Sequence, residues 1–244
     1  MFMEKVIEIK HLRKSFGKND VLTDINMELH RGENIAVLGK SGTGKSVMIK
    51  CIVRLIEADA GEISVKGQNI TELDIESLNE MRKKVGYLFQ GGALYDSMTV
   101  RENLEFPVRR TQMFRNKAEM KDLVEEALDH VGLLDAINKM PSELSGGMKK
   151  RIGLARTLIL KPEIILYDEP TTGLDPVTSG EISELIVHVR EKYNTSSIII
   201  THDMKCARMT ADKLKLMADG KFYVEGTFQE LSESDNQEVR AYFT

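Results

Sequence analysis

The sequence predicts an α/β fold, in which short buried strands alternate with helices that bury one face. Three observations carry this prediction. Short apolar runs such as 34–38 and 164–167 have the length and composition of strands inside a sheet. Apolar residues within 182–189 recur every three or four positions, as on one face of a helix. A glycine-rich segment, 39–46, joins one such strand to a helical pattern. A chain of 244 residues can bury a sizeable core, so we expect one domain with two subdomains.

The glycine-rich segment Gly39–Ser46 reads Gly-Lys-Ser-Gly-Thr-Gly-Lys-Ser, which matches the phosphate-binding pattern G-x-x-x-x-G-K-[ST]. Such glycines let backbone N–H groups face a polyphosphate, and the start of the next helix adds its positive dipole end. We expect Lys45 to neutralise the β- and γ-phosphates and the Ser46 hydroxyl to bind Mg²⁺. The alternative is a glycine-rich turn with a chance lysine, which the regular strand before it and the helical pattern after it disfavour. That helical pattern consists of Met48, Cys51, Ile52, Leu55 and Ile56.

Composition argues against two classes of protein. With a net charge of −4 and a pI near 5.8, the chain lacks the basic character of a general nucleic-acid-binding surface. No apolar run approaches the ~18 residues that span a bilayer, and we expect no signal peptide. Any membrane role is therefore expected to come through a partner. Cys51 and Cys206 form no metal-binding motif, which fits a reducing cytoplasm, and Cys51 is expected to be buried and unreactive.

Several strands are expected within the first ninety residues, besides the helix that follows the phosphate loop. The predicted strands are 6–9, 21–29, 61–65 and 85–89, with a short helix over 75–84. Phe16 precedes the phosphate loop on a short antiparallel segment, where its ring could stack on a purine, although an isolated Phe is more often part of a core. Gln90 ends a strand, and the carboxyl ends of strands are where α/β sheets bind ligands.

Residues 99–160 are expected to be mostly helical. One otherwise charged segment carries an apolar stripe of Leu123, Val124, Ala127, Leu128 and Val131. This pattern indicates a helical subdomain inserted into the α/β core. It ends at Leu144–Arg151, where Ser145 is a good N-cap and the glycines at 146 and 147 leave N–H groups free at a helix start. The sequence therefore predicts a second anion site, separate from the first.

Two later strands also end in polar side chains. The first ends in Asp168 and Glu169, which point to opposite sides because they are neighbours on a strand. Asp168 can hold Mg²⁺, and Glu169 could act on a water. The second strand, 197–200, leads to His202, a candidate ligand although a lone histidine is most often structural.

The C-terminal region carries more local signals. Residues 173–176 are expected to form a tight turn before a helix. Asp219-Gly220 predicts the turn of a hairpin between 214–217 and 221–224. The tail, 227–244, is expected to be helical and amphipathic.

Together, these motifs resemble those of the nucleotide-binding subunits of ABC transporters over about residues 6–226. In the family's order they are the stacking aromatic Phe16, the Walker A loop Gly39–Ser46, the Q-loop Gln90, the signature segment Leu144–Met148, the Walker B strand Ile164–Glu169, the D-loop Leu174-Asp175 and the switch histidine His202. The resemblance implies a P-loop NTPase fold in a single domain, 1–244. Its RecA-like core and antiparallel β-subdomain would span about 1–90 and 161–226, its inserted α-helical subdomain about 91–160, and its C-terminal helical tail about 227–244.

The resemblance also implies a role for each site residue, with ATP and Mg²⁺ as cofactors. ATP binding is assigned to Phe16, Gly39, Lys40, Ser41, Gly42, Thr43, Gly44, Lys45, Ser46 and Val47. Catalysis is assigned to Gln90, Glu169 and His202, and Mg²⁺ binding to Ser46, Gln90 and Asp168. Two copies close head to tail in such proteins, so contacts to the ATP held by the other copy are assigned to Ser145, Gly146, Gly147 and Asp175.

Within the family, the chain is most similar to the ATPases of Mla- and Mce-type lipid transport. The residues that carry this similarity are Phe89–Val100 and Leu144–Met148, whereas Asp168–Val177 is compatible but shared more widely. The family at large usually has Gln where Met148 stands and Thr where Val47 stands. Both changes leave the backbone contacts to nucleotide in place, so we expect activity to survive.

The resemblance implies three partners: a second copy in a homodimer, an integral-membrane permease, and a membrane-anchored substrate-binding protein. The permease is expected to dock near Gly91–Val100, where Ala93, Leu94, Tyr95 and Met98 offer apolar side chains. Leu94 could equally pack inside the helical subdomain. The protein would then be cytoplasmic and peripheral, held on the inner face of the cell membrane by the permease.

The sequence argues against two of three other kinds of ABC protein. A translation factor would carry two ATPase units, and a chromosome-maintenance ATPase would carry a long coiled coil between Walker A and signature, and this sequence has neither. Nucleic acid is therefore not an expected partner. An ABC importer for polar solutes such as amino acids shares all of the motifs, so it stays the alternative to lipid transport.

Overall fold

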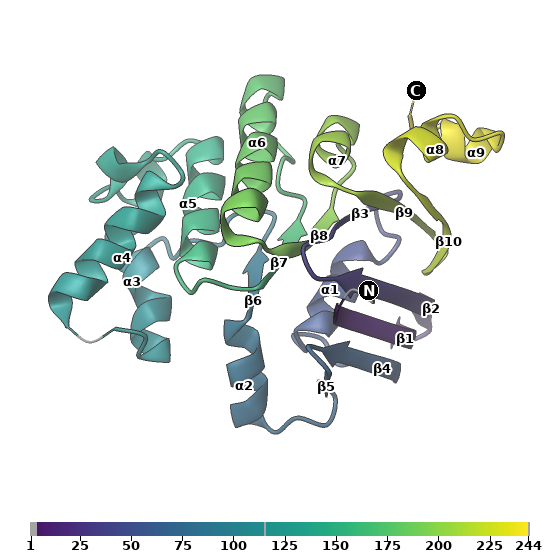
Figure 1. The fold of residues 1–244 in the computed structure, drawn as a ribbon, viewed down its shortest axis with the longest axis horizontal. Helices are drawn as coiled ribbons and strands as arrows, with labels where there is room; N and C mark the ends of the chain where they lie inside the picture. Colours follow the sequence, from purple (N-terminus) through teal and green to yellow (C-terminus); the bar gives the residue numbers. More distant parts are fainter. Residues whose placement is uncertain (1–3, 115, 244) are drawn as a thin grey trace.

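One ten-stranded sheet runs through the fold, with helices packed on both of its faces (Figure 1). The computed structural model describes residues 4–114 and 116–243; the first three residues of the expected N-terminal segment and Thr244 of the expected tail lie outside the described residues. Along the sheet the strands follow the order β5-β4-β1-β2-β10-β9-β3-β8-β7-β6. The strands are β1 (Lys5–Phe16), β2 (Asn19–His30), β3 (Asn34–Leu38), β4 (Ala60–Val65), β5 (Gln68–Asn69), β6 (Val85–Leu88), β7 (Ile164–Asp168), β8 (Ser196–Ile200), β9 (Lys213–Ala218) and β10 (Lys221–Gly226).

The sheet has an antiparallel part and a parallel part. Strands β5, β4, β1 and β2 pair antiparallel, whereas β3 is parallel to β8 and β9, and β7 is parallel to β8 and β6. Strand β10 joins the two parts, because it pairs antiparallel with β9 and touches β2 at Lys221. The hairpin predicted across Asp219-Gly220 is confirmed: both residues have positive φ, 47° and 71°, as a two-residue turn between twisted strands requires.

The helices follow the predicted alternation with the strands. They are α1 (Lys45–Ile52), α2 (Ile75–Lys83), α3 (Val100–Thr111), α4 (Lys117–Asp129), α5 (Gly146–Leu158), α6 (Pro176–Tyr193), α7 (Met204–Thr210), α8 (Phe228–Ser232) and α9 (Gln237–Arg240), with short 3-10 turns η1 (Leu134–Ala136) and η2 (Pro141–Glu143). The α/β class and the helix predicted over 75–84 are thereby confirmed.

The core explains why the parallel strands are apolar along their whole length. On β7, Ile164 and Leu166 belong to the cluster that contains α1, while Ile165 and Tyr167 belong to the cluster under α5 and α6. Successive side chains of a strand point to opposite faces, so a strand covered on both faces buries every residue. All five residues of β3, β7 and β8 are buried. The parallel strands are thus held rigidly, and their carboxyl ends are fixed in space.

A separate apolar cluster unites α3, α4 and α5 beyond the β6 edge of the sheet (Figure 1). The stripe predicted on α4 contributes to it: Val124, Ala127 and Leu128 are buried. Leu94 is half-buried and packs against this cluster, so of the two roles expected for Leu94 the structure shows inward packing.

The helix after the phosphate loop is shorter than the apolar pattern suggested. It ends at Ile52, because Arg54 takes a left-handed φ of 50° and the N–H of Leu55 turns back to the Lys50 carbonyl at 2.9 Å. This is the hydrogen-bond pattern of a Schellman motif, which stops a helix. Leu55, which the helical pattern included, consequently lies beyond the end of α1 and is 53% exposed.

The tail, expected to be helical, forms two short helices, α8 and α9. A capping box between Thr227 and Glu230 starts α8, and Asn236 caps α9. Their buried residues, Leu231 and Val239, pack into the apolar cluster that includes α7 and β9. Among the helices of the described residues, none combines the length and the hydropathy needed to cross a bilayer.

Candidate active site

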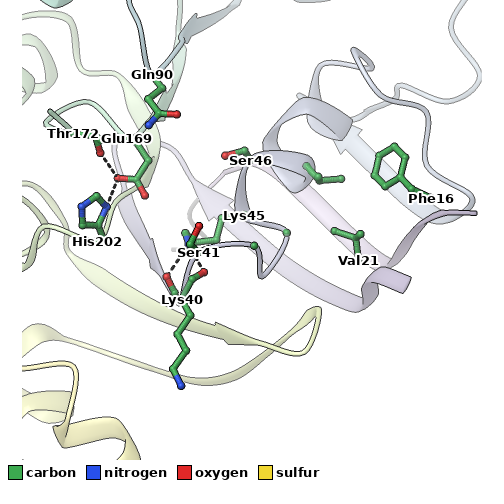
Figure 2. A pocket seen from close by; sticks show the side chains of 14 residues that line it. Phe16, Val21, Lys40, Ser41, Lys45, Ser46, Gln90, Glu169, Thr172 and His202 are labelled. Carbon is green, nitrogen blue, oxygen red and sulfur yellow. Dashed lines mark hydrogen bonds and ion pairs between the residues drawn. The ribbon is translucent and has the colours of Figure 1, made fainter. Parts of the chain in front are cut away.

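A cleft of about 790 Å³ opens over the loop that joins β3 to α1 (Figure 2). Figure 2 shows Gln90, Glu169, Thr172 and His202 on one side of the loop and Phe16 with Val21 on the other. Its lining is Phe16, Val21, Gly39, Lys40, Ser41, Gly42, Gly44, Lys45, Ser46, Val47, Gln90, Glu169, Thr172 and His202. Most residues predicted to touch nucleotide or to act in catalysis therefore meet in one cleft.

The floor of the cleft is the phosphate loop, whose shape depends on glycine. Gly44 has a φ of 98°, and a Cβ there would lie 2.8 Å from the Val21 carbonyl oxygen. A Cβ on Gly39 would lie 2.5 Å from the Met217 carbonyl oxygen. Because α1 begins at Lys45, the unpaired N–H groups of its first turn face the cleft, where they favour an anion.

The ammonium group of Lys45 is folded back onto the loop. Its Nζ donates to the carbonyl oxygens of Gly39 at 2.7 Å and Lys40 at 2.9 Å, and the residue is 7% exposed. Burial lowers the pKa of Lys45, while the negative charges of Asp168 and Glu169 oppose that shift. The loop thus holds a positive charge beside the start of α1. Phosphate oxygens would bind this charge more strongly than the two carbonyl oxygens do.

Asp168 lies behind the loop and is held by two hydroxyl groups. Ser46 Oγ donates to its Oδ1 at 2.6 Å, and Tyr87 OH donates to its Oδ2 at 3.0 Å. Burial and the nearby Asp168 raise the pKa of Tyr87, so its hydroxyl stays a donor. Tyr87 was not among the predicted site residues. It reaches Asp168 because β6 pairs in parallel with β7, and no local pattern in the sequence reveals that pairing.

Glu169 has different partners from its neighbour Asp168. His202 Nδ1 lies 2.8 Å from Glu169 Oε2, and Thr172 Oγ1 donates to the same oxygen at 2.9 Å. Glu169 also takes a left-handed φ of 52°, which is unusual for a residue with a side chain. The carboxylate is therefore fixed at the cleft wall. Thr172 was not predicted, although its position three residues after Glu169 was a possible signal.

The opposite wall is formed by Phe16 and Val21. Phe16 is 49% exposed, so it is not part of the core, and its ring faces the cleft (Figure 2). Lys14 Nζ lies 5.3 Å from the centre of that ring. An exposed ring opposite a phosphate loop can stack on a flat base. Val21, which was not predicted, adds an apolar surface beside it.

Other predicted residues do not line this cleft. Thr43 closes the loop by donating its Oγ1 to the Lys40 carbonyl at 3.0 Å. Ser145 accepts the Met148 N–H at 3.2 Å as the N-cap of α5, and Asp175 accepts the Val177 N–H at 3.0 Å as the N-cap of α6.

These two helix starts lie close together. A Cβ on Gly147 would lie 2.5 Å from Thr178 Cγ2, so α5 and α6 approach closely at their N-terminal ends. Ser145, Gly146, Gly147 and Asp175 thus form a group outside the cleft of their own chain.

Comparison with known proteins identifies the family. The model of the ABC transporter family matches residues 22–172. The probable ribonucleotide transport ATP-binding protein mkl of Mycobacterium leprae is 39% identical over 242 residues, 99% of this chain and 70% of that protein. The intermembrane phospholipid transport system ATP-binding protein MlaF of Haemophilus influenzae is 38% identical over 237 residues, 97% of this chain and 89% of that protein.

A solved structure gives the same result for the fold. The dimeric post-hydrolysis state of an ATP-binding cassette bound to ADP and Pi superposes with a TM-score of 0.83 and 29% identity, covering 91% of this chain and 98% of that one. The phosphate loop, the paired carboxylates and the histidine thus occur in a chain that belongs to the ABC transporter family, as an ATP-binding subunit that hydrolyses ATP.

Proposed function

We propose that this subunit powers the transport of phospholipids or related lipids through a separate membrane permease. The observation that supports this cargo most strongly is the similarity to the phospholipid transport protein MlaF, which extends over 97% of this chain and 89% of that protein. The segments Phe89–Val100 and Leu144–Met148, which resemble the lipid-transport branch, agree with it.

The positions of the site residues support a different role for each of them in ATP hydrolysis. The phosphates would lie on the loop N–H groups and Lys45, with the base stacked on Phe16. Glu169, oriented by His202 and Thr172, would act on the attacking water. The contacts of this carboxylate support the assignment because they hold it at the cleft wall.

The hydroxyl and carboxylate behind the loop suit Mg²⁺. Ser46 Oγ and Asp168 Oδ1 are 2.6 Å apart, and oxygen donors are the ligands that this ion prefers. With Gln90, they would hold Mg²⁺, which would neutralise charge on the phosphates. Among the described residues, no group of three or more His, Cys, Asp and Glu could hold a metal, so phosphate oxygens would complete the set.

The chain would work as a homodimer with composite sites. Ser145, Gly146, Gly147 and Asp175 lie outside the cleft of their own chain, and the start of α5 offers N–H groups to an anion. Head-to-tail pairing would bring them to the ATP of the second copy. The division of the chain into a core with a β-subdomain, a helical subdomain at about 91–160 and a tail is part of this proposal.

The permease would dock on the segment Gly91–Val100, called here the docking segment. Tyr95 in this segment is 45% exposed, and its ring centre lies 5.0 Å from that of Phe106. Beside this pair is a groove of about 280 Å³ lined by Met98, Glu102, Glu105, Phe106 and Arg109. An amphipathic helix of a membrane protein suits such a surface, which combines the apolar side chains of Met98 and Phe106 with charged ones.

Purification of the intact complex tests the lipid proposal. From gently solubilised membranes, we expect mass spectrometry to find this subunit with a permease and a membrane-anchored substrate-binding protein. Phospholipid should stimulate the ATPase activity of that complex. The subunit would accordingly be cytoplasmic and held on the inner face of the membrane. Recovery of the complex without bound lipid, and with no response to phospholipid, would contradict the proposal.

A polar-solute importer is the second candidate, because the methionine import ATP-binding protein MetN of Brucella abortus is 35% identical over 221 residues, 91% of this chain and 59% of that protein. The ATPase activity of the same purified complex distinguishes the importer from the lipid transporter. Stimulation of ATP hydrolysis by a small soluble ligand, together with a permease that lacks lipid, would favour the importer. Both outcomes leave the ATPase assignment unchanged.

A further inference from the structure

The fifth residue of helix α5, Lys150, is a buried cation that the ATPase mechanism does not account for. It is 5% exposed. Its Nζ donates to the Glu169 carbonyl oxygen at 3.2 Å and to the Thr172 carbonyl oxygen at 2.5 Å. Neither of these acceptors is a carboxylate, so the ammonium binds the backbone of the segment that carries Glu169.

A lysine in this position is costly for the fold. Burial lowers the pKa of Lys150 to about 8, while the negative charge of Glu169 favours the charged form. A buried charge is unfavourable unless hydrogen bonds compensate it, and an apolar side chain of similar length would often be more stable. Stability alone therefore does not explain the residue.

The two carbonyls belong to the backbone that sets the direction of the Glu169 side chain. Glu169 has a left-handed φ of 52°, and its N–H donates to the Ile200 carbonyl at 2.9 Å. Its carbonyl accepts a long bond, 3.3 Å, from the Thr172 N–H in addition to the bond from Lys150. The Thr172 hydroxyl in turn donates to the Glu169 carboxylate. Lys150 thus holds both ends of a short backbone segment in an unusual conformation.

The helix that carries Lys150 also contacts the docking segment. Arg156 donates to the carbonyl oxygens of Gly92 at 3.1 Å and Ala93 at 2.9 Å. A Cβ on Gly92 would lie 2.8 Å from the Lys149 carbonyl oxygen, so helix and segment are in close contact. A single rigid helix therefore touches the docking segment and the backbone of Glu169.

We propose that Lys150 is a positioning residue for hydrolysis, which holds the backbone of Glu169 in its own chain through the Glu169 and Thr172 carbonyls. This inference rests on the role of Glu169 in the proposed function. Lys150 touches neither nucleotide nor water in this scheme. It acts by keeping the Glu169 carboxylate directed into the cleft.

The first test compares Lys150→Met with Lys150→Arg and with the control Lys149→Met. Lys149 is adjacent on the same helix, is half-exposed and does not line the cleft. Lys150→Met should lower kcat at least ~10-fold, because small displacements of a reacting group are costly, with ATP affinity unchanged. Lys150→Arg should recover part of that loss, and Lys149→Met should match the wild type.

Thermal unfolding separates positioning from a structural role. Lys150→Met removes a buried charge, so its melting temperature should equal or exceed that of the wild type. A loss of kcat that accompanies an equal loss of folded protein would overturn the proposal, as would a wild-type kcat. In the Glu169→Gln background, Lys150→Met should cost no further turnover, because the group that it positions is already absent.

Mixed dimers show in which chain Lys150 acts. A mixed dimer of one Lys150→Met subunit and one Ser145→Arg subunit should regain one intact site. In that site the Ser145→Arg subunit supplies a correctly positioned Glu169, and the Lys150→Met subunit supplies an unmutated signature segment. Lys150→Met subunits mixed with Glu169→Gln subunits should regain none. The reverse pattern would overturn the proposal, because it would place Lys150 in the signature function. The control pair, Ser145→Arg with Glu169→Gln, should complement; its failure would count against composite sites and leave the kcat test of Lys150 standing.

Discussion

Adjacent residues in this site have different chemical surroundings, as the pair Asp168 and Glu169 shows. Asp168 accepts from Ser46 and Tyr87 behind the phosphate loop, whereas Glu169 contacts His202 and Thr172 at the cleft wall. Strand β7 ends at Asp168, and the left-handed φ of Glu169, the next residue, separates the two carboxylates. One of them is therefore suited to a metal ion and the other to water.

Replacement of Glu169 tests the second of these roles. Glu169→Gln keeps the shape of the side chain but removes the base, so turnover should fall by ~10²–10⁴ while ATP binding is retained. The variant should also accumulate as a closed dimer with ATP, because release depends on hydrolysis. Steady-state hydrolysis and light scattering measure the two effects. Turnover close to that of the wild type would show that Glu169 is not the base.

The two cysteines offer a test of core packing. Cys51 is 1% exposed and Cys206 is fully buried, and burial raises the pKa of each thiol to about 11. At pH 8 roughly one thiol in a thousand is then a thiolate, the form that reacts with alkylating reagents. We expect no labelling of the native protein under conditions that label both thiols in urea, as read by intact mass. Labelling of the native protein at the unfolded rate would contradict this packing.

At the scale of single elements, helix starts provide the charged and polar contacts of the site. Helix α1 begins at the phosphate loop, α5 begins at Ser145, and α6 begins at Asp175. Each start leaves N–H groups without helical partners, and the dipole makes that end positive. The first lies in the cleft, and the other two lie together outside it. This arrangement favours an ATP site to which two chains contribute.

Mixing of subunits tests that arrangement. Ser145→Arg removes the N-cap and places a bulky cation at the start of α5, so it should abolish hydrolysis at the other copy's ATP. Lys45→Ala should abolish productive binding in its own cleft, because the phosphates lose their main point charge. Each variant alone should be nearly inactive, and a mixture should regain activity.

Thermal unfolding is the control for this experiment, since loss of an N-cap costs ~1 kcal/mol of stability. Normal hydrolysis by Ser145→Arg alone would rule out a role for α5 in trans. Unchanged affinity and turnover in Lys45→Ala would rule out Lys45 as the phosphate-binding cation.

At the scale of the whole molecule, one buried residue of α3 holds the backbone of the docking segment. Asn103 of α3 is fully buried; its Nδ2 donates to the carbonyls of Tyr95 and Met98, and its Oδ1 accepts the Tyr95 N–H at 2.8 Å. The backbone of the docking segment is therefore held independently of the exposed Tyr95 ring. A change of that side chain should leave the fold intact.

The variant Tyr95→Glu changes the exposed ring without changing the contacts that hold the backbone of the docking segment. It places a negative charge on the apolar surface, so the subunit should detach from its permease while free ATP hydrolysis and melting temperature stay unchanged. Co-purification from solubilised membranes measures the effect. The matched control is Tyr223→Glu, since Tyr223 is 38% exposed and lies on β10, far from α3 along the sheet (Figure 1). If Tyr95→Glu stays bound as well as Tyr223→Glu, the docking segment is not the permease contact.

Features with local causes were predictable from the sequence. The phosphate loop, the turn at Asp219-Gly220 and the N-cap Ser145 depend on the backbone preferences of a few consecutive residues. The α/β class followed from periodicity, because a residue's position within a strand or helix decides which face it occupies. These predictions are confirmed, whereas the roles assigned to the site residues stay predictions.

Features that depend on distant segments were decided by the tertiary structure. Tyr87 reaches Asp168 only because β6 pairs with β7, and Lys150 reaches Glu169 only because α5 packs beside the end of β7. The end of α1 also departed from the apolar pattern, because Arg54 takes a left-handed φ before Leu55. Periodicity reports which residues prefer burial, but pairing and packing determine what lies opposite each of them. For this reason, the sequence located the phosphate loop and the carboxylates, while only the fold identified the groups that hold them in place.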